Sequence, residues 1–302
     1  MTNDVSSSRA VTRHMIDLKQ VATAPDLTFD VMVAGAEDGP LVLMLHGFAE
    51  SFHMWRAHMP ALAAAGFRAV APSQRGYSPG ARPDTHEPAN YSLDHLINDA
   101  LNIAAACGNI DRGIHLVGHD WGGSIAWGIA DRYPDRIASL TVLSRPHPNA
   151  FNRALAAPDG EQKSRSSHHW WFLEPEAAEW ILADDARWLR ERLKANGLPS
   201  AAIDQHVSVL SNRAAMEAAL AWYRARGAIR APLGAIRVPT LFIWGDADDT
   251  VGRMAAEGTA EFIAAPYQFE VLTGVGHFAA EQVPARVTEL LLAHLAAHPQ
   301  KN

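Results

Sequence analysis

The sequence predicts an α/β protein in which a mostly parallel sheet carries an inserted helical subdomain. Three observations support this fold class. Apolar runs of strand length alternate with longer helical patterns, a rhythm typical of βαβ units. The rhythm stops near residue 146 and returns near residue 236, and the segment between reads as helix and loop. The length of 302 residues fits one large domain with such an insertion.

The strands are expected to form one eight-stranded sheet. The first two candidates look antiparallel, and the six that follow are continuous apolar runs, which suit strands covered on both faces by helices. In chain order the expected strands are Val11–Leu18, Leu27–Ala34, Pro40–Leu45, Arg68–Ala71, Gly113–Val117, Ile137–Leu143, Thr240–Trp244 and Tyr267–Leu272. Helical patterns fill the gaps, for example Leu93–Cys107, Gly123–Arg132 and Pro284–His298. Residues 1–9 are polar and lack the apolar region of a signal peptide, so we expect a frayed tail.

The helical segment is expected to form a cap over the sheet. We assign residues 146–235 to the cap, and residues 1–145 and 236–302 to the two parts of the core. Five of the nine tryptophans lie in the cap. Most of them are expected to be packing residues, and Trp171 is the first choice for lining a substrate cavity. An aromatic, weakly charged cap indicates a small apolar substrate.

The composition argues against several classes of protein. A net charge of −7 is unfavourable for binding nucleic acid, because phosphate contacts need a basic surface. No stretch approaches the roughly 18 apolar residues of a membrane span. The single cysteine, Cys107, allows no intramolecular disulfide, which fits a reducing compartment and makes the cytoplasm the expected location. The histidines show no metal-ligand spacing and no phosphate loop is present, so neither metal nor cofactor is expected. A monomer and a homodimer both stay open.

One expected strand leads directly into a tight turn that carries an aspartate. The segment Gly118-His119-Asp120-Trp121-Gly122 places small residues two positions either side of Asp120, and a helical pattern follows. This is the pattern of a nucleophile elbow, in which the turn lifts the central side chain above the sheet and a bulkier residue at either glycine would collide with its neighbours. The helix N-terminus also favours an anion at Asp120. The alternative is that Asp120 only caps this helix, since aspartate is a preferred N-cap residue.

An acid and a base follow the candidate nucleophile in the chain order expected for this type of site. Asp248 lies three residues beyond Gly245, the glycine that ends an expected strand, and is therefore preferred as the acid over Asp246 and Asp249. His277 follows the last expected strand and is the expected base.

A fourth motif, His46-Gly47-Phe48, ends an early strand. In folds with a nucleophile elbow, the loop after such a strand supplies one donor of the oxyanion hole. The backbone N–H groups of Phe48 and Trp121 are therefore expected to form the hole. His46 is expected to brace the loop and not to react.

Together these motifs resemble the epoxide hydrolase and haloalkane dehalogenase branch of the α/β-hydrolase fold superfamily. The resemblance covers nearly the whole chain and implies that Asp120 is the nucleophile. A small departure is Ala49, where the family usually has proline. The motifs that carry the resemblance are His46-Gly47-Phe48, Arg75-Gly76-Tyr77-Ser78, Gly118-His119-Asp120-Trp121-Gly122, the Asp248 turn and Gly276-His277.

The cap offers the residues that would distinguish the leaving group. The segment ending in Trp222-Tyr223-Arg224 resembles the epoxide hydrolase segment with an acid tyrosine, which assigns that role to Tyr223. The family's other ring-opening tyrosine precedes a Phe-x-Glu-Pro stretch, and by this alignment His168 replaces it. Some relatives pair a histidine with a tyrosine. The histidine at position 168, although it is the main departure from the family pattern, therefore still leaves two hydrogen-bond donors for the ring oxygen. Both residues could instead be ordinary cap residues.

Other relatives and one other class stay open. Haloalkane dehalogenases place a tryptophan after the aspartate, as Trp121 does, although their second halide donor is often an asparagine where Phe48 stands. Fluoroacetate dehalogenases hold a substrate carboxylate with arginine just after the nucleophile, and Trp121 and Ser124 at these positions argue against a carboxylate substrate. A non-catalytic small-molecule receptor is the alternative from another class.

The expected function is hydrolysis of an apolar epoxide to a vicinal diol. Asp120 would attack an epoxide carbon while Tyr223 and His168 assist the ring oxygen, and His277, oriented by Asp248, would activate water against the resulting ester. Beside the catalytic residues, the substrate is expected to contact Phe48, Trp121 and Trp171.

Overall fold

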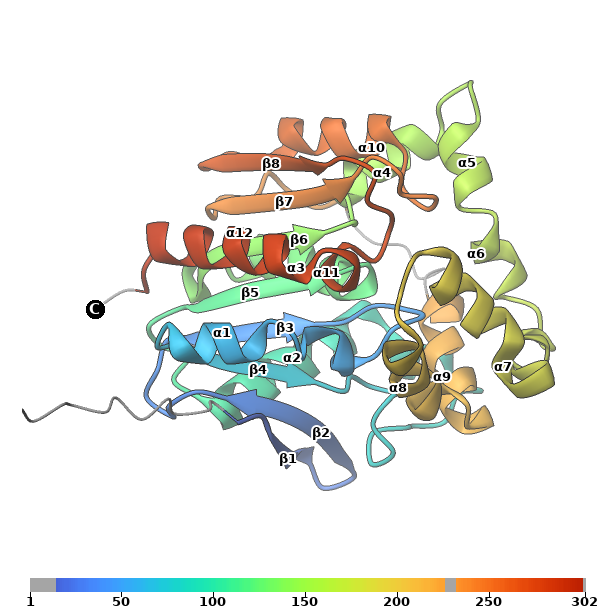
Figure 1. Ribbon diagram of the computed structural model, residues 1–302, viewed down its shortest axis with the longest axis horizontal. Helices are drawn as coiled ribbons and strands as arrows, with labels where there is room; N and C mark the ends of the chain where they lie inside the picture. The colour runs from blue at the N-terminus through green and yellow to red at the C-terminus, as the bar shows by residue number, and fades with distance from the viewer. Residues whose placement is uncertain (1–14, 226–231, 301–302) are drawn as a thin grey trace, which may run out of the picture.

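The described residues fold around one twisted sheet with helices on both faces (Figure 1). The computed structural model describes residues 15–225 and 232–300. Within them, eight strands are hydrogen-bonded in the order β1-β2-β4-β3-β5-β6-β7-β8. The first two strands form an antiparallel hairpin, β2 also pairs antiparallel with β4, and the pairings from β4 to β8 are parallel. The sheet is therefore the mostly parallel, eight-stranded sheet that the sequence predicts.

The parallel strands end at one edge of the sheet, and this alignment positions the site. Leu45 at the end of β3 pairs with Gly118 in β5, and Leu143 at the end of β6 pairs with His119 and Ile243. The loops that follow these strands therefore start side by side. The strands are β1 (Asp17–Ala24), β2 (Leu27–Ala34), β3 (Leu41–Leu45), β4 (Arg68–Pro72), β5 (Ile114–His119), β6 (Ile137–Leu143), β7 (Thr240–Gly245) and β8 (Tyr267–Leu272).

The core has two apolar layers because each face of the sheet is covered by helices. One layer contains α2 (Leu93–Cys107) and α3 (Trp121–Arg132), and the other contains α1 (Met59–Ala64) and α12 (Pro284–Ala297). Shorter helical turns complete the core: η1 (Phe52–Trp55), η2 (Pro88–Tyr91), η3 (Pro134–Arg136), α10 (Arg253–Gly258), η5 (Thr259–Phe262) and α11 (Ala279–Gln282). No helix of the described residues is long and apolar enough to cross a membrane.

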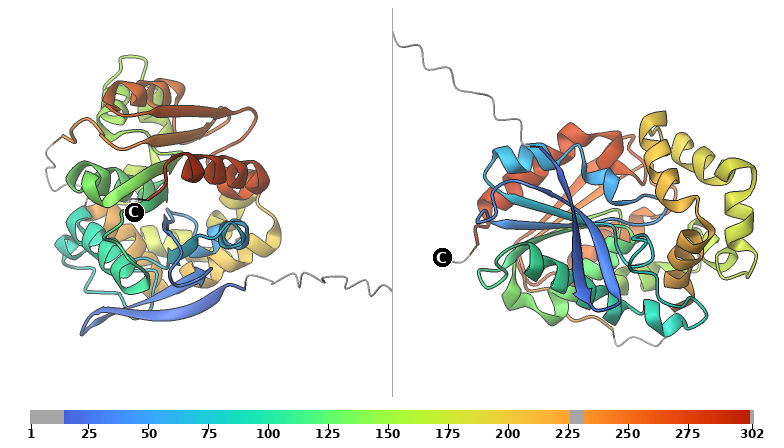
Figure 2. Two further views of the ribbon diagram at one scale, coloured as in Figure 1. Left: turned by 90° about the vertical axis from the view of Figure 1, so that its left-hand side faces the viewer. Right: turned by 90° about the horizontal axis from the view of Figure 1, so that it is seen from below.

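Between β6 and β7 the described chain is helical, as the sequence predicts. The last three of these helices pack against one another beyond the ends of the parallel strands (Figures 1 and 2). The first, α4, packs instead against α10 and η5 beside the sheet. The helices are α4 (Pro148–Leu155), α5 (Glu161–Arg165), α6 (His168–Trp171), α7 (Ala177–Ala195), α8 (Ser200–Leu210) and α9 (Arg213–Arg224). The boundaries of the cap at residues 146 and 235 stay a prediction.

The first strand differs from its predicted position. The sequence suggests Val11–Leu18, part of which lies outside the described residues, whereas β1 is Asp17–Ala24. This strand lies at the edge of the sheet, and only Val21 in it is buried, so it carries no apolar pattern that could mark it. The other seven strands lie within two residues of their predicted bounds.

Candidate active site

Asp120 stands at the sharp turn between β5 and α3. Its backbone has φ 48° and ψ −115°, a conformation that L-residues rarely adopt. A Cβ at Gly118 would come closer than 3.0 Å to the backbone of Gly122, and a Cβ at Gly122 closer than 3.0 Å to that of Leu45. The two glycines are therefore required by close packing of helix and strand. The Asp120 side chain makes no capping hydrogen bond to α3, so a simple N-cap role does not explain it.

The three predicted triad residues come together in space. The Nδ1 atom of His277 lies 3.1 and 3.0 Å from the two carboxylate oxygens of Asp248, and its Nε2 lies 3.8 Å from Oδ2 of Asp120. All three residues are buried. The backbone N–H groups of Thr250 and Val251 donate to Oδ1 of Asp248, which fixes the carboxylate toward the imidazole.

The two rival acids are engaged elsewhere. Asp246 accepts a hydrogen bond from the backbone N–H of Gly274 on the surface. Asp249 forms an ion pair with Arg192 of α7 at 3.2 Å. Neither contact involves His277, and the geometry therefore supports Asp248 as the acid.

The loop after β3 presents a donor to the nucleophile. The backbone N–H of Phe48 donates to Oδ1 of Asp120 at 3.1 Å. The backbone must approach closely here, because a Cβ at Gly47 would lie 2.5 Å from the Asp120 Cβ. His46 accepts a hydrogen bond from the N–H of Gln74 at 3.2 Å, and burial lowers the pKa of His46 to about 3, so it is a neutral brace of this loop. The Phe48 contact matches one of the two predicted oxyanion donors.

Electrostatics couples Asp120 and His277. Burial alone would lower the pKa of His277, but the charges of Asp248 and Asp120 outweigh burial and raise it to about 10. Burial would likewise raise the pKa of Asp120, yet His277 and then Arg145 hold it well below its usual range. The resting pair is therefore an aspartate beside an imidazolium.

A second buried network lies behind the triad. Oε2 of Glu50 is 2.9 Å from Nδ1 of His119, and Nε2 of His119 is 2.9 Å from the carbonyl oxygen of His277. Burial raises the pKa of Glu50, and His119 opposes this effect. The network supports the loop that carries His277, and no sequence motif points to it.

Donor atoms of Glu50, His206 and Glu281 lie within 4.8 Å of one another, a spacing that a metal ion could use. His206, however, accepts the Ser51 N–H at 3.0 Å through Nδ1 and faces Glu281 at 2.6 Å through Nε2. Both ring nitrogens are therefore already used, and the cluster fits a hydrogen-bonded link between α8 and the core better than a metal site.

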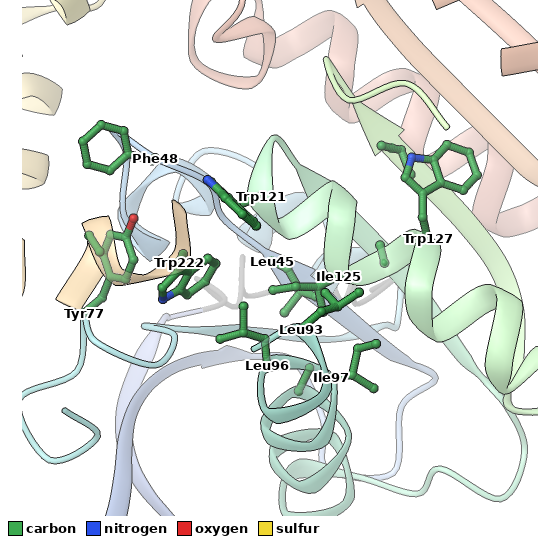
Figure 3. Close-up of a cluster of buried hydrophobic side chains, with 14 of the residues drawn as sticks. Leu45, Phe48, Tyr77, Leu93, Leu96, Ile97, Trp121, Ile125, Trp127 and Trp222 are labelled. Carbon is green, nitrogen blue, oxygen red and sulfur yellow. The ribbon is translucent and has the colours of Figure 1, made fainter. Parts of the chain in front are cut away.

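Tyr223 of the cap packs against residues that adjoin the nucleophile. Its ring centroid lies 5.1 Å from that of Trp121, 5.8 Å from that of Phe48 and 4.9 Å from that of Phe172. Figure 3 shows the side chains of Phe48, Trp121 and Trp222 gathered at one end of the buried cluster, away from Trp127. The structure thus brings the predicted residues Phe48, Trp121 and Tyr223 together next to Asp120.

A core loop holds Tyr223 in this position. Nε1 of Trp222 donates to the carbonyl oxygen of Arg75 at 3.0 Å, and the Arg75 guanidinium is itself fixed by Asp99 at 2.5 and 2.8 Å. Gly76 has φ 89°, and a Cβ there would lie 2.8 Å from the Cβ of Ala218 in α9. The predicted motif around Arg75 therefore serves to seat α9 on the core.

Two adjacent cap histidines lie near Tyr223. His168 packs on Phe172 and His169, and burial, followed by the charge of Arg192, lowers its pKa to about 4. The charges of Asp120 and His277 have smaller, opposing effects on the pKa of His168. His169 is the one whose ring lies beside Tyr223, at 5.6 Å between centroids. The family motif in the sequence points to His168 and gives no signal for His169.

A cavity of about 510 Å³ opens beside Tyr223 between α4, α6 and α9. Trp170 lines it, whereas Trp171 stacks on Trp180 and packs against Trp188 inside the cap. Trp171 does not line this cavity, because the short helix α6 directs Trp170 toward it instead, and the contact of Trp171 with substrate stays a prediction. The other lining residues are Asn152, Leu155, Lys163, Ser166, His169, Leu173, Tyr223 and Arg224.

Comparison with known proteins shows similarity to the alpha/beta hydrolase fold and to epoxide hydrolases. A family model described as the alpha/beta hydrolase fold matches residues 40–284. Epoxide hydrolase A of Mycobacterium tuberculosis is 31% identical, over 88% of this chain and 93% of its own length. Human epoxide hydrolase 4 is 28% identical, over 91% of this chain and 77% of its own length.

Solved structures agree in fold. A structure described as a novel epoxide hydrolase from metagenomes of hot environments superposes with a TM-score of 0.81 at 29% identity, covering 94% of this chain and 100% of its own. Epoxide hydrolase A from Mycobacterium thermoresistibile superposes with a TM-score of 0.80 at 25% identity, covering 95% and 100% of the two chains.

Proposed function

The chain belongs to the α/β-hydrolase fold family and is a hydrolase, and we propose that it opens an epoxide to a vicinal diol through an ester on Asp120. One observation carries the proposal. An aspartate stands at the elbow, with one carboxylate oxygen on the Phe48 N–H and the other facing His277, and Tyr223 of the cap packs on the adjoining Trp121.

The nucleophile type restricts the chemistry. A serine that opened an epoxide would become an ether, which an oxyanion hole cannot help to cleave. An aspartate that attacks an sp³ carbon becomes an ester, and water can hydrolyse this ester at its carbonyl carbon. Asp120 therefore favours displacement at an alkyl carbon over ordinary esterase activity.

In the first step Oδ2 of Asp120 attacks one epoxide carbon, and the carbon–oxygen bond of the ring breaks. Tyr223 donates a proton or a hydrogen bond to the departing ring oxygen, assisted by His168. Phe48, Trp121 and Phe172 surround this position with apolar surface, which suits an epoxide with an apolar body. Trp171 stays a predicted substrate contact that packs inside the cap in this structure.

In the second step water hydrolyses the ester, and formation of the ester itself makes this step possible. Esterification removes the negative charge of Asp120, which is one of the two charges that raise the pKa of His277. The pKa of His277 therefore falls, and the imidazolium releases its proton, which replaces the proton that the ring oxygen takes up through Tyr223. The neutral imidazole can then take a proton from water. The Phe48 N–H already points at Oδ1, where negative charge develops when this water attacks the ester carbon. Asp248 holds the imidazole throughout.

A single turnover in ¹⁸O-labelled water tests the ester route. With enzyme in excess over styrene oxide, the label is expected in Asp120, read by mass spectrometry of its peptide, and largely absent from the diol. Label found directly in the first-turnover diol would show that water attacks the epoxide itself and would exclude the ester.

The variant His277→Gln provides the matching trap. We expect it to form the ester and to hydrolyse it slowly, so that intact-protein mass spectrometry shows an adduct of one substrate mass. Full turnover without an adduct would remove His277 from its role. Parallel assays with styrene oxide and a bromoalkane, reading diol and bromide, separate an epoxide hydrolase from a haloalkane dehalogenase. A chain that turns over neither would instead be the receptor considered above.

A further inference from the structure

Arg145 is a buried cation with no ion pair to another described residue. Among the described residues three arginines are almost fully buried, with exposed fractions of 5% for Arg68, 5% for Arg75 and 8% for Arg145. Arg75 forms a bidentate pair with Asp99, and Arg68 donates to the carbonyl oxygen of Gly35 at 2.6 Å. In residues 15–225 and 232–300, Nε of Arg145 is buried and has no hydrogen-bond partner. Buried charges are normally paired, because desolvating an unpaired ion is costly.

The stem of Arg145 is fixed beside the nucleophile. Its backbone carbonyl oxygen accepts a hydrogen bond from Nε1 of Trp127 at 2.8 Å. A Cβ at Gly123, in the first turn of the helix that Asp120 opens, would lie 2.7 Å from the Cβ of Arg145. The guanidinium carbon lies 4.7 Å from the ring centre of Phe151 in α4. The carbonyl oxygen of Leu143, two residues before Arg145, accepts the backbone N–H of Asp120 at 3.3 Å. Burial lowers the pKa of Arg145, and Asp120 and then Tyr223 oppose this effect.

Asp120 cannot serve as the lasting partner of this guanidinium. One of its oxygens accepts the Phe48 N–H and the other faces His277. In the ester state Asp120 carries no charge at all, so Arg145 would face the intermediate as an isolated buried cation. A negative group on the substrate would remove this cost during the whole reaction cycle.

The cavity beside the site has a matching charge. Phe151 precedes Asn152, and both Asn152 and Leu155 of the same helix line the cavity. Its described lining contains the cations Lys163 and Arg224 and no carboxylate. Arg224 is partly neutralised by Glu217 at 2.9 Å, and the rest of the lining is aromatic, aliphatic or neutral. A cavity with this lining favours an anion with an apolar body.

We propose that Arg145 is a specificity-determining residue that binds a carboxylate carried next to the epoxide ring, so that 2,3-epoxy acids with an apolar substituent are preferred substrates. This inference rests on the proposed epoxide hydrolase function. The planar guanidinium can donate two parallel hydrogen bonds to a carboxylate, while Phe151 holds its face. Trp121 and Ser124 after the nucleophile do not exclude a carboxylate substrate, because the cation comes from the end of β6.

The test compares one acid with its uncharged counterpart. For wild type we expect kcat/KM to be at least tenfold higher on 3-phenylglycidate than on β-methylstyrene oxide. In Arg145→Met, which keeps bulk and burial, we expect this ratio to fall by about 10- to 100-fold, the loss of a charge-assisted pair. Arg145→Lys keeps the charge but loses the two parallel N–H donors of the guanidinium, so it should give an intermediate ratio of kcat/KM values. The matched control Arg153→Met removes a surface arginine of α4 that pairs with Glu261 and should leave the ratio unchanged.

Equal losses on the acid and the neutral epoxide in Arg145→Met would overturn the proposal, since Arg145 would then only support Asp120 or the fold. If Arg145→Met does not fold, inhibition of the wild-type protein still tests the proposal. Inhibition by 3-phenylpropionate should be at least tenfold stronger than inhibition by 3-phenylpropionamide, and equal inhibition would refute the site. If no epoxide is hydrolysed, the proposed function fails separately, and thermal stabilisation by 3-phenylpropionate but not by the amide still reports the anion site.

Discussion

At the scale of single residues, the active site is a balanced set of charges held out of water. Asp120 and Asp248 flank His277, and each carboxylate favours the imidazolium between them. The reaction removes one of these charges and later restores it. Much of the proposed catalysis therefore follows from how the His277 proton responds to the state of Asp120.

This coupling can be measured without substrate. Asp120→Asn removes the charge that the ester would also remove, so we expect a lower pKa for His277 than in wild type and a loss of turnover of at least about a thousandfold. Titration of the imidazole by NMR reports the pKa directly, with the exposed His86 as an internal control. An unchanged pKa would contradict the proposed switch of His277 from acid to base.

Tyr223 gives a second residue-scale prediction. Tyr223→Phe keeps the ring that packs on Trp121 and Phe172 but removes the hydroxyl. We expect epoxide opening to slow by about 100-fold or more, because the ring oxygen loses its acid, with little change in stability. Pre-steady-state formation of the Asp120 ester is the measurement. His169→Ala and His168→Ala, compared in the same assay, identify which histidine assists Tyr223.

At the scale of elements, the elbow joins β5 to α3 with almost no free space. Gly122 meets the backbone of Leu45, whereas Gly128 of the same helix meets only the ends of the Ile97 and Leu93 side chains. Backbone atoms cannot rotate away from an added methyl group as a side chain can. The position of Asp120 is therefore set by a contact between main chains.

Two alanine substitutions in α3 test this difference. We expect Gly122→Ala to lower the free energy of unfolding by about 3 kcal/mol, because helix and strand must separate. Gly128→Ala should change it by less than about 1 kcal/mol, since the gain in helix propensity offsets a small shift of Ile97. Urea unfolding measures both variants, and equal effects would show that the elbow is not specially constrained.

The sequence predicted much of these elements for a physical reason. Strands buried on both faces and the glycines around Asp120 leave strong local patterns, and Asp248 and His277 follow in a chain order that the fold imposes. The edge strand β1 leaves no such pattern, since one face and one edge meet water. Arg145, His169 and the pair Glu50–His119 could not be predicted, because their roles arise from contacts between distant segments.

At the scale of the whole molecule, buried neutral histidines make stability depend on pH. Burial lowers the pKa of five nearly inaccessible histidines to between about 3 and 4, while the unfolded chain keeps its ordinary value near 6.5. Below pH 6.5 the unfolded state therefore binds more protons than the folded state. The residues are His46, His58, His115, His147 and His294.

We therefore expect the free energy of unfolding to decrease as the pH falls from 6.5 toward 4. His277 acts in the opposite direction, because its raised pKa stabilises the folded state most below pH 6.5 and this contribution is lost as the pH rises toward 10. One such group does not offset five. Urea unfolding at pH 7 and pH 5 is the measurement, and equal stability at the two values would contradict the expectation.

The hydrogen bonds between cap and core affect how this protein could be re-engineered. Arg165 donates to the carbonyl oxygen of Asp248, His206 accepts the N–H of Ser51, and Trp222 donates to the carbonyl oxygen of Arg75. These partners lie in the loops that also carry the acid, the oxyanion donor and the seat of α9. A chimera that imports only a foreign cap would break all three links at once, so recombination with a relative would succeed when each cap helix travels with the core loop to which it is bonded.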